Sequence, residues 1–302
     1  MTALFLGLFI PIGFIYVRNY FRSTVETLEE VKDISTVPVL GVVMHSKKKK
    51  KQTHAPLFHE QPKSSLAEAF RSIRSNLLFL MGRVNTAKTL MISSSISGEG
   101  KSFCSANISI SLASTGKRTV LVVADMRKPQ MYLPMQQQEL LKDGLSTYLI
   151  GSKMLDEVIQ TTSIENLDVI NAGAVPPNPA ELLMGESMDE LIQDLKKRYD
   201  YVIIDTPPLG LVSDALILGK YADASIYIVR QDRTPIEKLK GLERIYKEQM
   251  LENVGIIFND VKAQTVGVYG YGSYGGYGSY GYYETNDVSL SWWRRIVSKI
   301  KR

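Results

Sequence analysis

A short apolar run, a glycine-rich turn and a helical pattern follow one another between residues 90 and 114. Leu90–Ser95 has the composition of a short buried strand, and Phe103–Ser114 has that of a helix. The turn between them has the sequence Ile-Ser-Gly-Glu-Gly-Lys-Ser and ends in Lys101 and Ser102. Backbone N–H groups at the start of such a helix bind anions, the lysine reaches the outer phosphates of a nucleotide, and the hydroxyl is a ligand for Mg²⁺. The segment therefore predicts a P-loop.

The expected nucleotide contacts come from this turn and the first helical residue. They are Ser97, Gly98, Glu99, Gly100, Lys101, Ser102 and Phe103. The strict P-loop pattern has glycine where this chain has Ser95. The alternative is a glycine turn that only caps the helix, but this alternative does not explain why lysine and serine follow the turn. We expect Lys101 to lie on a surface loop, where it contributes phosphate contact and no packing.

Two other apolar runs end in aspartate. Thr119–Ala124 is followed by Asp125, and Tyr201–Ile204 is followed by Asp205. Ligands of an open parallel sheet bind beyond the carboxyl ends of its strands, so both carboxylates should lie near the P-loop. We expect Ser102, Asp125 and Asp205 to hold Mg²⁺, with Asp205 in the Walker B position, and Lys101, Asp125 and Asp205 to act in catalysis. A single aspartate after a strand is as often a cap or turn former, but two in phase with a P-loop favour a site.

Apolar runs and helical patterns alternate through the middle of the chain. The strand-like runs lie near 90–94, 120–124, 168–171, 201–204, 225–230 and 254–258. The clearest helical patterns are Ala180–Arg198 and Pro235–Gln249. This alternation predicts an α/β P-loop NTPase fold with a doubly wound, mostly parallel sheet and helices on both faces. We assign residues 65–262 to this domain.

Residues 269–283 contain seven tyrosines, six glycines and two serines. So much glycine raises the entropic cost of ordering the backbone, and no apolar face forms with the period of a helix or a strand. Tyrosines on such a coil keep their hydroxyls in water, where a phosphoryl donor can reach them. We therefore expect a tail over residues 263–287 that is phosphorylated at Tyr269, Tyr271, Tyr274, Tyr277, Tyr280, Tyr282 and Tyr283.

The chain resembles the bacterial tyrosine kinases of the polysaccharide co-polymerase type. The matching segments are Ser-Gly-Glu-Gly-Lys-Ser at 97–102, Asp-Met-Arg-Lys-Pro at 125–129, Ile-Ile-Asp-Thr-Pro-Pro at 203–208, and the tyrosine tail. The resemblance implies a kinase that uses ATP and Mg²⁺ to phosphorylate its own tail and that regulates capsule or exopolysaccharide synthesis and export. Asn259 resembles the position that contacts the adenine edge, although an asparagine in a turn is equally compatible with the sequence.

The resemblance also implies partners. Glu68, Arg71 and Arg74 match an oligomerisation motif, which implies a ring-like homo-oligomer. A glycine-rich tail reaches a neighbouring active site as easily as its own, so we expect phosphorylation in trans. The further partners are polysaccharide polymerisation and export proteins and a tyrosine phosphatase, and we expect no nucleic acid.

One residue departs from the pattern of that family. The family's second strand ends in Asp-x-Asp-Met-Arg, and the first of these aspartates falls on Val123 here. Either Asp125 and Asp205 suffice, or phosphoryl transfer is weakened. The alternatives are a partitioning-type ATPase, against which the absence of lysine from Ser93–Ser97 counts, and a nucleotide-gated scaffold without efficient kinase activity.

The first 22 residues predict a transmembrane helix. Ala3–Val17 carries no charge and is followed by Arg18 and Arg22, which place the C-terminal side in the cytoplasm. These fifteen residues span about 22 Å as a helix, less than a hydrocarbon core of roughly 30 Å. A cleaved signal peptide is the alternative, but the basic start and cleavage site are missing. The resemblance implies a second transmembrane helix, shortened here in a fragment of a longer protein of the bacterial inner membrane, with the kinase domain in the cytoplasm.

Residues 23–64 should form a juxtamembrane linker, in which Lys47–Lys51 is either a solvated run or a site of attraction to anionic lipid. Residues 288–302 carry two tryptophans and five basic residues, which indicates a basic amphipathic segment at the membrane surface or a frayed terminus. The chain has one cysteine, Cys104, so it can form no internal disulfide.

Overall fold

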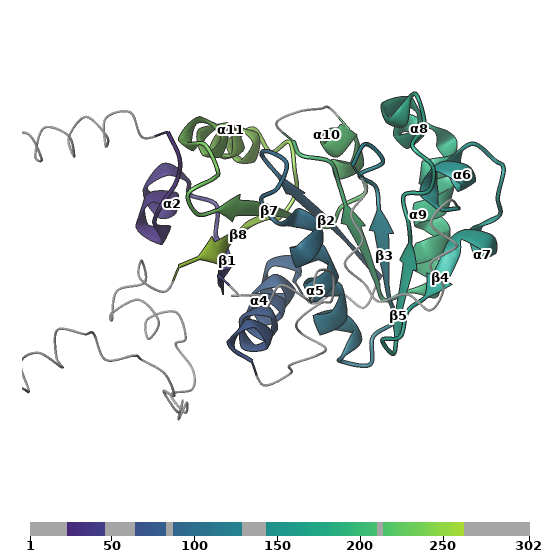
Figure 1. The fold of residues 1–302 in the computed structure, drawn as a ribbon, viewed down its shortest axis with the longest axis horizontal. Helices are drawn as coiled ribbons and strands as arrows, with labels where there is room; N and C mark the ends of the chain where they lie inside the picture. The colour runs from purple at the N-terminus through teal and green to yellow at the C-terminus, as the bar shows by residue number, and fades with distance from the viewer. Residues whose placement is uncertain (1–22, 46–63, 83–86, 129–142, 210–213, 263–302) are drawn as a thin grey trace, which may run out of the picture. The chain divides into compact units, whose positions relative to one another are not determined.

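The computed structural model describes residues 23–45, 64–82, 87–128, 143–209 and 214–262 (Figure 1). All of them belong to the compact unit Met1–Thr265, and a second unit comprises Val266–Arg302. The expected transmembrane helix at 1–22, the tyrosine tail and the basic C-terminal segment lie outside the described residues. Among the helices within the described ranges, none has the length and the apolar character that crossing a bilayer requires.

The described residues form one eight-stranded sheet with the order β1-β8-β7-β2-β6-β3-β5-β4. Neighbouring strands run parallel except β4, which pairs antiparallel with β5 at one edge. The strands are β1 (Val39–Met44), β2 (Lys88–Ser94), β3 (Thr119–Val123), β4 (Ile159–Thr161), β5 (Leu167–Ile170), β6 (Tyr201–Asp205), β7 (Ala224–Arg230) and β8 (Val254–Val261). The predicted mostly parallel α/β sheet is confirmed.

The helices lie on both faces of this sheet. They are α2 (Leu28–Ile34), α4 (Ser65–Met81), α5 (Lys101–Ala113), α6 (Leu145–Leu149), α7 (Leu155–Val158), α8 (Pro179–Met184), α9 (Glu186–Arg198), α10 (Asp214–Gly219) and α11 (Ile236–Lys247). The connection from β2 to β3 runs toward the β4 edge, and that from β7 to β8 runs toward the β1 edge. Right-handed crossovers in opposite directions place α5 and α11 on opposite faces, as Figure 1 shows.

The hydrophobic core lies between the sheet and the helices that cover its two faces. Every residue of β3 is buried, as are all but the first of β2, which agrees with the apolar residues at the centre of each strand. On α4, the side chains of Phe70, Ile73 and Leu77 are fully buried. A Cβ at Gly41 of β1 would lie 2.5 Å from Ile73 Cγ1, so the absence of a side chain there lets α4 approach the sheet.

Residues 23–45, which the sequence places in a linker, are part of the folded unit. β1 forms the edge strand and pairs parallel with β8. The backbone N–H of Val25 donates to the carbonyl of Thr234 at 2.9 Å, and Thr24 forms an isolated bridge with Pro235. The hydrogen-bonding partner of this strand lies more than 200 residues later in the chain, so the sequence near β1 does not predict its place in the sheet.

Candidate functional site

The glycine-rich turn lies between the end of β2 and the start of α5. Gly98 and Gly100 have φ angles of 84° and 96°, in the left-handed region that glycine adopts without strain. A Cβ at Gly100 would come within 2.2 Å of the Asn259 side-chain nitrogen. Gly100 is also the N-cap residue of α5 and supplies no side-chain cap. The first amide groups of α5 are therefore available to an anion at the predicted position.

Lys101 is buried, which corrects the expectation of a surface-loop lysine. Its Nζ lies 3.3 Å from Asp125 Oδ2 and 3.9 Å from Asp205 Oδ1. The side chains of Lys101 and Asp125 are each 10% exposed, and that of Asp205 is 1% exposed. The structure thus brings the three predicted catalytic residues together at the carboxyl ends of adjacent strands. Two carboxyl groups therefore lie beside the lysine in the unliganded chain.

The environment of Asp205 favours its protonated form. Burial raises the pKa of this carboxyl, and Lys101 works against that rise. The Ser105 hydroxyl donates to Asp205 Oδ1 at 3.2 Å. Val123 is the register partner of Asp205 on β3 and is itself buried, so an apolar side chain stands where the related pattern has a carboxylate.

The donor set suits Mg²⁺. The predicted ligands offer one hydroxyl oxygen and two carboxylates, and Mg²⁺ commonly takes one or two carboxylates together with phosphate oxygens and water. The charge of Lys101 and the start of α5 suit the phosphates of a nucleotide. Within the described ranges, no group of three or more His, Cys, Asp or Glu side chains is arranged to hold a metal ion.

Two further predicted nucleotide contacts are engaged inside the protein. Asn259 Nδ2 donates to the backbone carbonyl of Glu99 at 2.8 Å, so this asparagine lies against the P-loop. The ring of Phe103 meets that of Phe70 edge to face, with centroids 6.1 Å apart, and so joins α5 to α4. A contact of Asn259 with adenine stays a prediction.

Three residues that sequence reasoning missed also hold the P-loop. Arg230 Nη1 donates to the carbonyl of Gly98 at 2.6 Å, and Arg233 Nη2 donates to that of Ser97 at 3.1 Å. The Thr234 hydroxyl donates to the side chain of Glu99. The available signal was the position of residues 230–235, from the end of a predicted strand to the start of a predicted helix, at the edge of the sheet that carries the P-loop.

The residues of the predicted oligomerisation motif do not share one outward face. On α4, Arg71 pairs with Glu68 within the helix, while Arg74 is turned toward α5. There, Arg74 Nη1 donates to the backbone carbonyl and the hydroxyl of Ser111. A role of this helix in assembly therefore depends more on Glu68 and Arg71, and oligomerisation stays a prediction.

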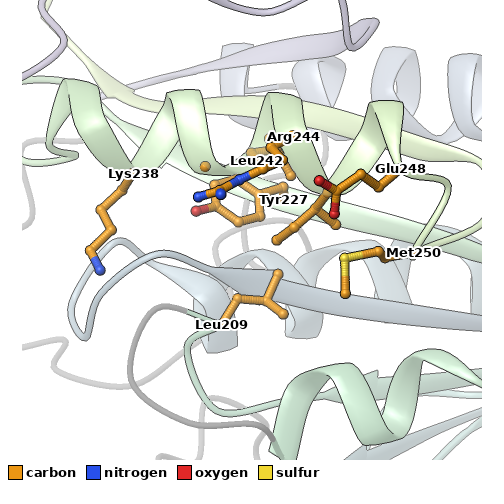
Figure 2. A pocket seen from close by; sticks show the side chains of 9 residues that line it. Leu209, Tyr227, Lys238, Leu242, Arg244, Glu248 and Met250 are labelled. Atoms are coloured by element: carbon orange, nitrogen blue, oxygen red, sulfur yellow. The ribbon is translucent and has the colours of Figure 1, made fainter.

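Figure 2 shows a pocket of about 330 Å³ beneath α11. It is lined by Leu209, Tyr227, Lys238, Gly241, Leu242, Arg244, Ile245, Glu248 and Met250. Burial raises the pKa of the Tyr227 hydroxyl well above its ordinary value. None of the predicted catalytic or nucleotide-binding residues lines this pocket, but Tyr227 on its wall interacts with Ser95 and Glu99 of the P-loop region.

Residues 87–254 match the family model described as an AAA domain. The chain is 36% identical over 198 residues to the putative tyrosine-protein kinase CapB of Staphylococcus aureus, covering 64% of this chain and 86% of that protein. It is 33% identical over 283 residues to a putative tyrosine-protein kinase in the cps region of Klebsiella pneumoniae, covering 89% of this chain but only 39% of that relative's length. The kinase domain of Escherichia coli tyrosine kinase ETK superposes with a TM-score of 0.69 at 28% identity, covering 85% of this chain and all of that one.

Proposed function

This chain belongs to the family of bacterial tyrosine-protein kinases, and from that membership we propose that it transfers the γ-phosphoryl group of ATP to tyrosines of its own tail, residues 269–283. Through this modification it would regulate capsule or exopolysaccharide synthesis and export. The observation that carries the proposal is the position of Lys101, between two buried strand-end carboxylates and at the N-terminus of α5.

The residues of the site have separate roles in this proposal. Lys101 and the first amide groups of α5 bind the outer phosphates, and Ser102, Asp125 and Asp205 hold Mg²⁺. Mg²⁺, when bound, neutralises charge that develops on the phosphates. Either Asp125 or Asp205 orients the tyrosine hydroxyl and accepts its proton.

We extend the proposal to the rest of the assembly. Residues 1–22 anchor the chain in the inner membrane with the kinase domain on the cytoplasmic side. A ring built through Glu68 and Arg71 of α4 presents each tail to a neighbouring active site. Polysaccharide polymerisation and export proteins act with the ring, and a tyrosine phosphatase resets it. The relative in a cps region supports a role of this kind.

One observation favours a second candidate function. Val123 leaves the site with two strand-end aspartates, and its buried side chain lies opposite Asp205 in the sheet. A chain that binds nucleotide but transfers phosphate poorly would act as a nucleotide-gated scaffold of the export machinery. The two functions differ in whether phosphotyrosine forms.

A phosphotyrosine immunoblot of the purified chain tests the kinase proposal. With ATP and Mg²⁺ the wild-type chain should become labelled, and a chain whose seven tail tyrosines are phenylalanine should not. Asp125→Asn should reduce labelling, because it removes a proposed Mg²⁺ ligand. Equal labelling of the phenylalanine variant would show that the acceptors lie elsewhere. A wild-type chain that binds ATP but never labels would support the scaffold.

A further inference from the structure

The side chain of Glu99 lies inside the protein although Glu99 belongs to the loop that holds phosphates. It is fully buried. Its Oε1 accepts a hydrogen bond from the Ser95 hydroxyl at 2.7 Å, and its Oε2 accepts one from the Ile96 amide at 2.8 Å. The hydroxyl of Thr234 also donates to Oε1. One carboxylate therefore connects the end of β2, the P-loop itself and the segment between β7 and α11.

The interaction with Ser95 explains why this P-loop departs from the strict pattern. Glycine at position 95 could not donate a hydrogen bond from a side chain, whereas the hydroxyl of Ser95 forms one of the three contacts to the carboxylate. Ser95 is also fully buried, so its hydroxyl needs such a partner. The serine and the glutamate four residues later form one unit.

The outer side of the loop is held by a row of donors. The carbonyls of Ser97, Gly98 and Glu99 accept hydrogen bonds from Arg233, Arg230 and Asn259, respectively. The N–H of a trans peptide points opposite to its carbonyl, so the amides that follow these carbonyls point toward the other side of the loop. That side is where phosphate oxygens bind in a P-loop.

The polarity of the Glu99 side chain argues against a role that only fills space. A buried carboxylate is costly, and the contacts to this one come from two hydroxyls and an amide. A negative charge beside the phosphates of a nucleotide also opposes their binding. A carboxylate that is retained against both effects has to contribute something specific, and charge-assisted hydrogen bonds from three parts of the chain supply geometry.

We propose that Glu99 is a positioning residue whose carboxylate holds the P-loop in its phosphate-binding shape before nucleotide arrives. Its side chain acts through Ser95, Ile96 and Thr234 and does not touch the nucleotide, while its backbone amide remains among the predicted phosphate contacts. The inference rests on the proposed function in that the ligand is ATP. Loss of the carboxylate lowers the fraction of chains with a competent loop, and the apparent dissociation constant rises by the same factor.

The test is a titration of the purified chain with ATP and Mg²⁺, for wild type and Glu99→Gln. Glutamine has the same shape, but its NH₂ group faces either the Ile96 amide, which can only donate, or the hydroxyls of Ser95 and Thr234, which then have to turn and accept. We expect Glu99→Gln to bind ATP at least about tenfold more weakly, a change of about 1.4 kcal/mol. At saturating ATP its kcat should stay close to wild type while KM rises, because the residue acts on binding. Unchanged affinity would overturn the inference, and so would tighter binding, which is what removal of phosphate repulsion alone predicts.

A matched pair at Thr234 decides the outcome if Glu99→Gln does not fold. Thr234→Val keeps the volume and removes the hydroxyl that reaches Glu99, whereas Thr234→Ser keeps the hydroxyl. Weaker ATP binding by the valine variant, restored in the serine variant at an equal thermal midpoint, supports the inference. Equal affinity of the two variants contradicts it. A folded wild-type chain that binds no ATP would contradict the proposed function and the inference with it.

Discussion

Replacing Lys101 by methionine should destabilise the folded chain as well as remove a phosphate contact. Methionine keeps much of the side-chain volume but leaves Asp125 and Asp205 without the cation that lies 3.3 and 3.9 Å from them. Removing one partner of a buried ion pair costs about 3–5 kcal/mol. In a domain of roughly 200 residues each kcal/mol shifts the unfolding midpoint by about 2–4 °C, so we expect a loss of about 10 °C.

The loss should depend on pH. Burial raises the pKa of Asp205 and Lys101 opposes that rise, so the pKa should be higher still in Lys101→Met. A carboxyl whose pKa is higher in the folded than in the unfolded state stabilises the fold below the unfolded value, about 3.9, and that stability is lost as the pH rises through the folded value. The deficit of Lys101→Met should therefore be larger at about pH 8 than at about pH 5.

Thermal unfolding followed by circular dichroism measures this deficit. The matched control is Lys240→Met, because Lys240 pairs with Glu237 at the surface, where the two side chains are 58% and 80% exposed. The control should unfold close to wild type. Adding Asp125→Asn to Lys101→Met should restore part of the loss, since one uncompensated charge is removed. If Lys101→Met unfolds like wild type at both pH values, Lys101 does not compensate these carboxylates in the unliganded chain.

Three other outcomes are expected. Lys101→Met chains should be phosphorylated when they are mixed with chains whose tail tyrosines are phenylalanine, at a temperature below the unfolding midpoint of Lys101→Met. A Lys101→Met chain that stays unlabelled on a phosphotyrosine blot would exclude transfer between subunits. Arg71→Ala should be monomeric and poorly phosphorylated, and light scattering that still finds a large oligomer would remove Arg71 from the assembly surface. Burial opposes ionisation of Glu243, but hydrogen bonds, the strongest from the Thr36 amide, hold its pKa at about 2. The carboxylate of Glu243 contributes to the free energy of unfolding at pH values above the ordinary glutamate pKa near 4.3, and this contribution is lost as the pH falls toward 2. In urea titrations, the stability of Glu243→Gln should therefore fall less steeply at acidic pH than that of wild type. An equal fall would contradict this.

The parts of the fold that could be predicted are those with local signals. Strands buried on both faces give unbroken apolar runs, and β2, β3 and β6 lie where such runs occur. The three-residue strand β4 was not predicted, because a segment of that length shows no periodicity. Strand β1 lies in the segment that we assigned to a linker, and its place beside β8 follows from a pairing between distant parts of the chain.

Some features of the site could also be predicted from local sequence, and others depend on distant residues. Lys101, Asp125 and Asp205 could be placed together because each follows directly on a buried strand or the glycine turn, and the carboxyl ends of parallel strands meet at one edge. The burial of Lys101 could not be predicted, since it depends on how closely two other strands bring their carboxylates. The inward direction of the Glu99 side chain depends likewise on Thr234, which is 135 residues away.

Kinase activity toward the tail is tested most directly by mapping phosphate on the purified chain with tandem mass spectrometry, after incubation with ATP and Mg²⁺. The expected result is phosphate on tyrosines of residues 269–283 in the wild-type chain and little or none in Asp205→Asn, which lacks the Walker B carboxylate. Hydrolysis of ATP without phosphate on any of these tyrosines would contradict the proposed activity, and so would an unchanged phosphorylation pattern in Asp205→Asn.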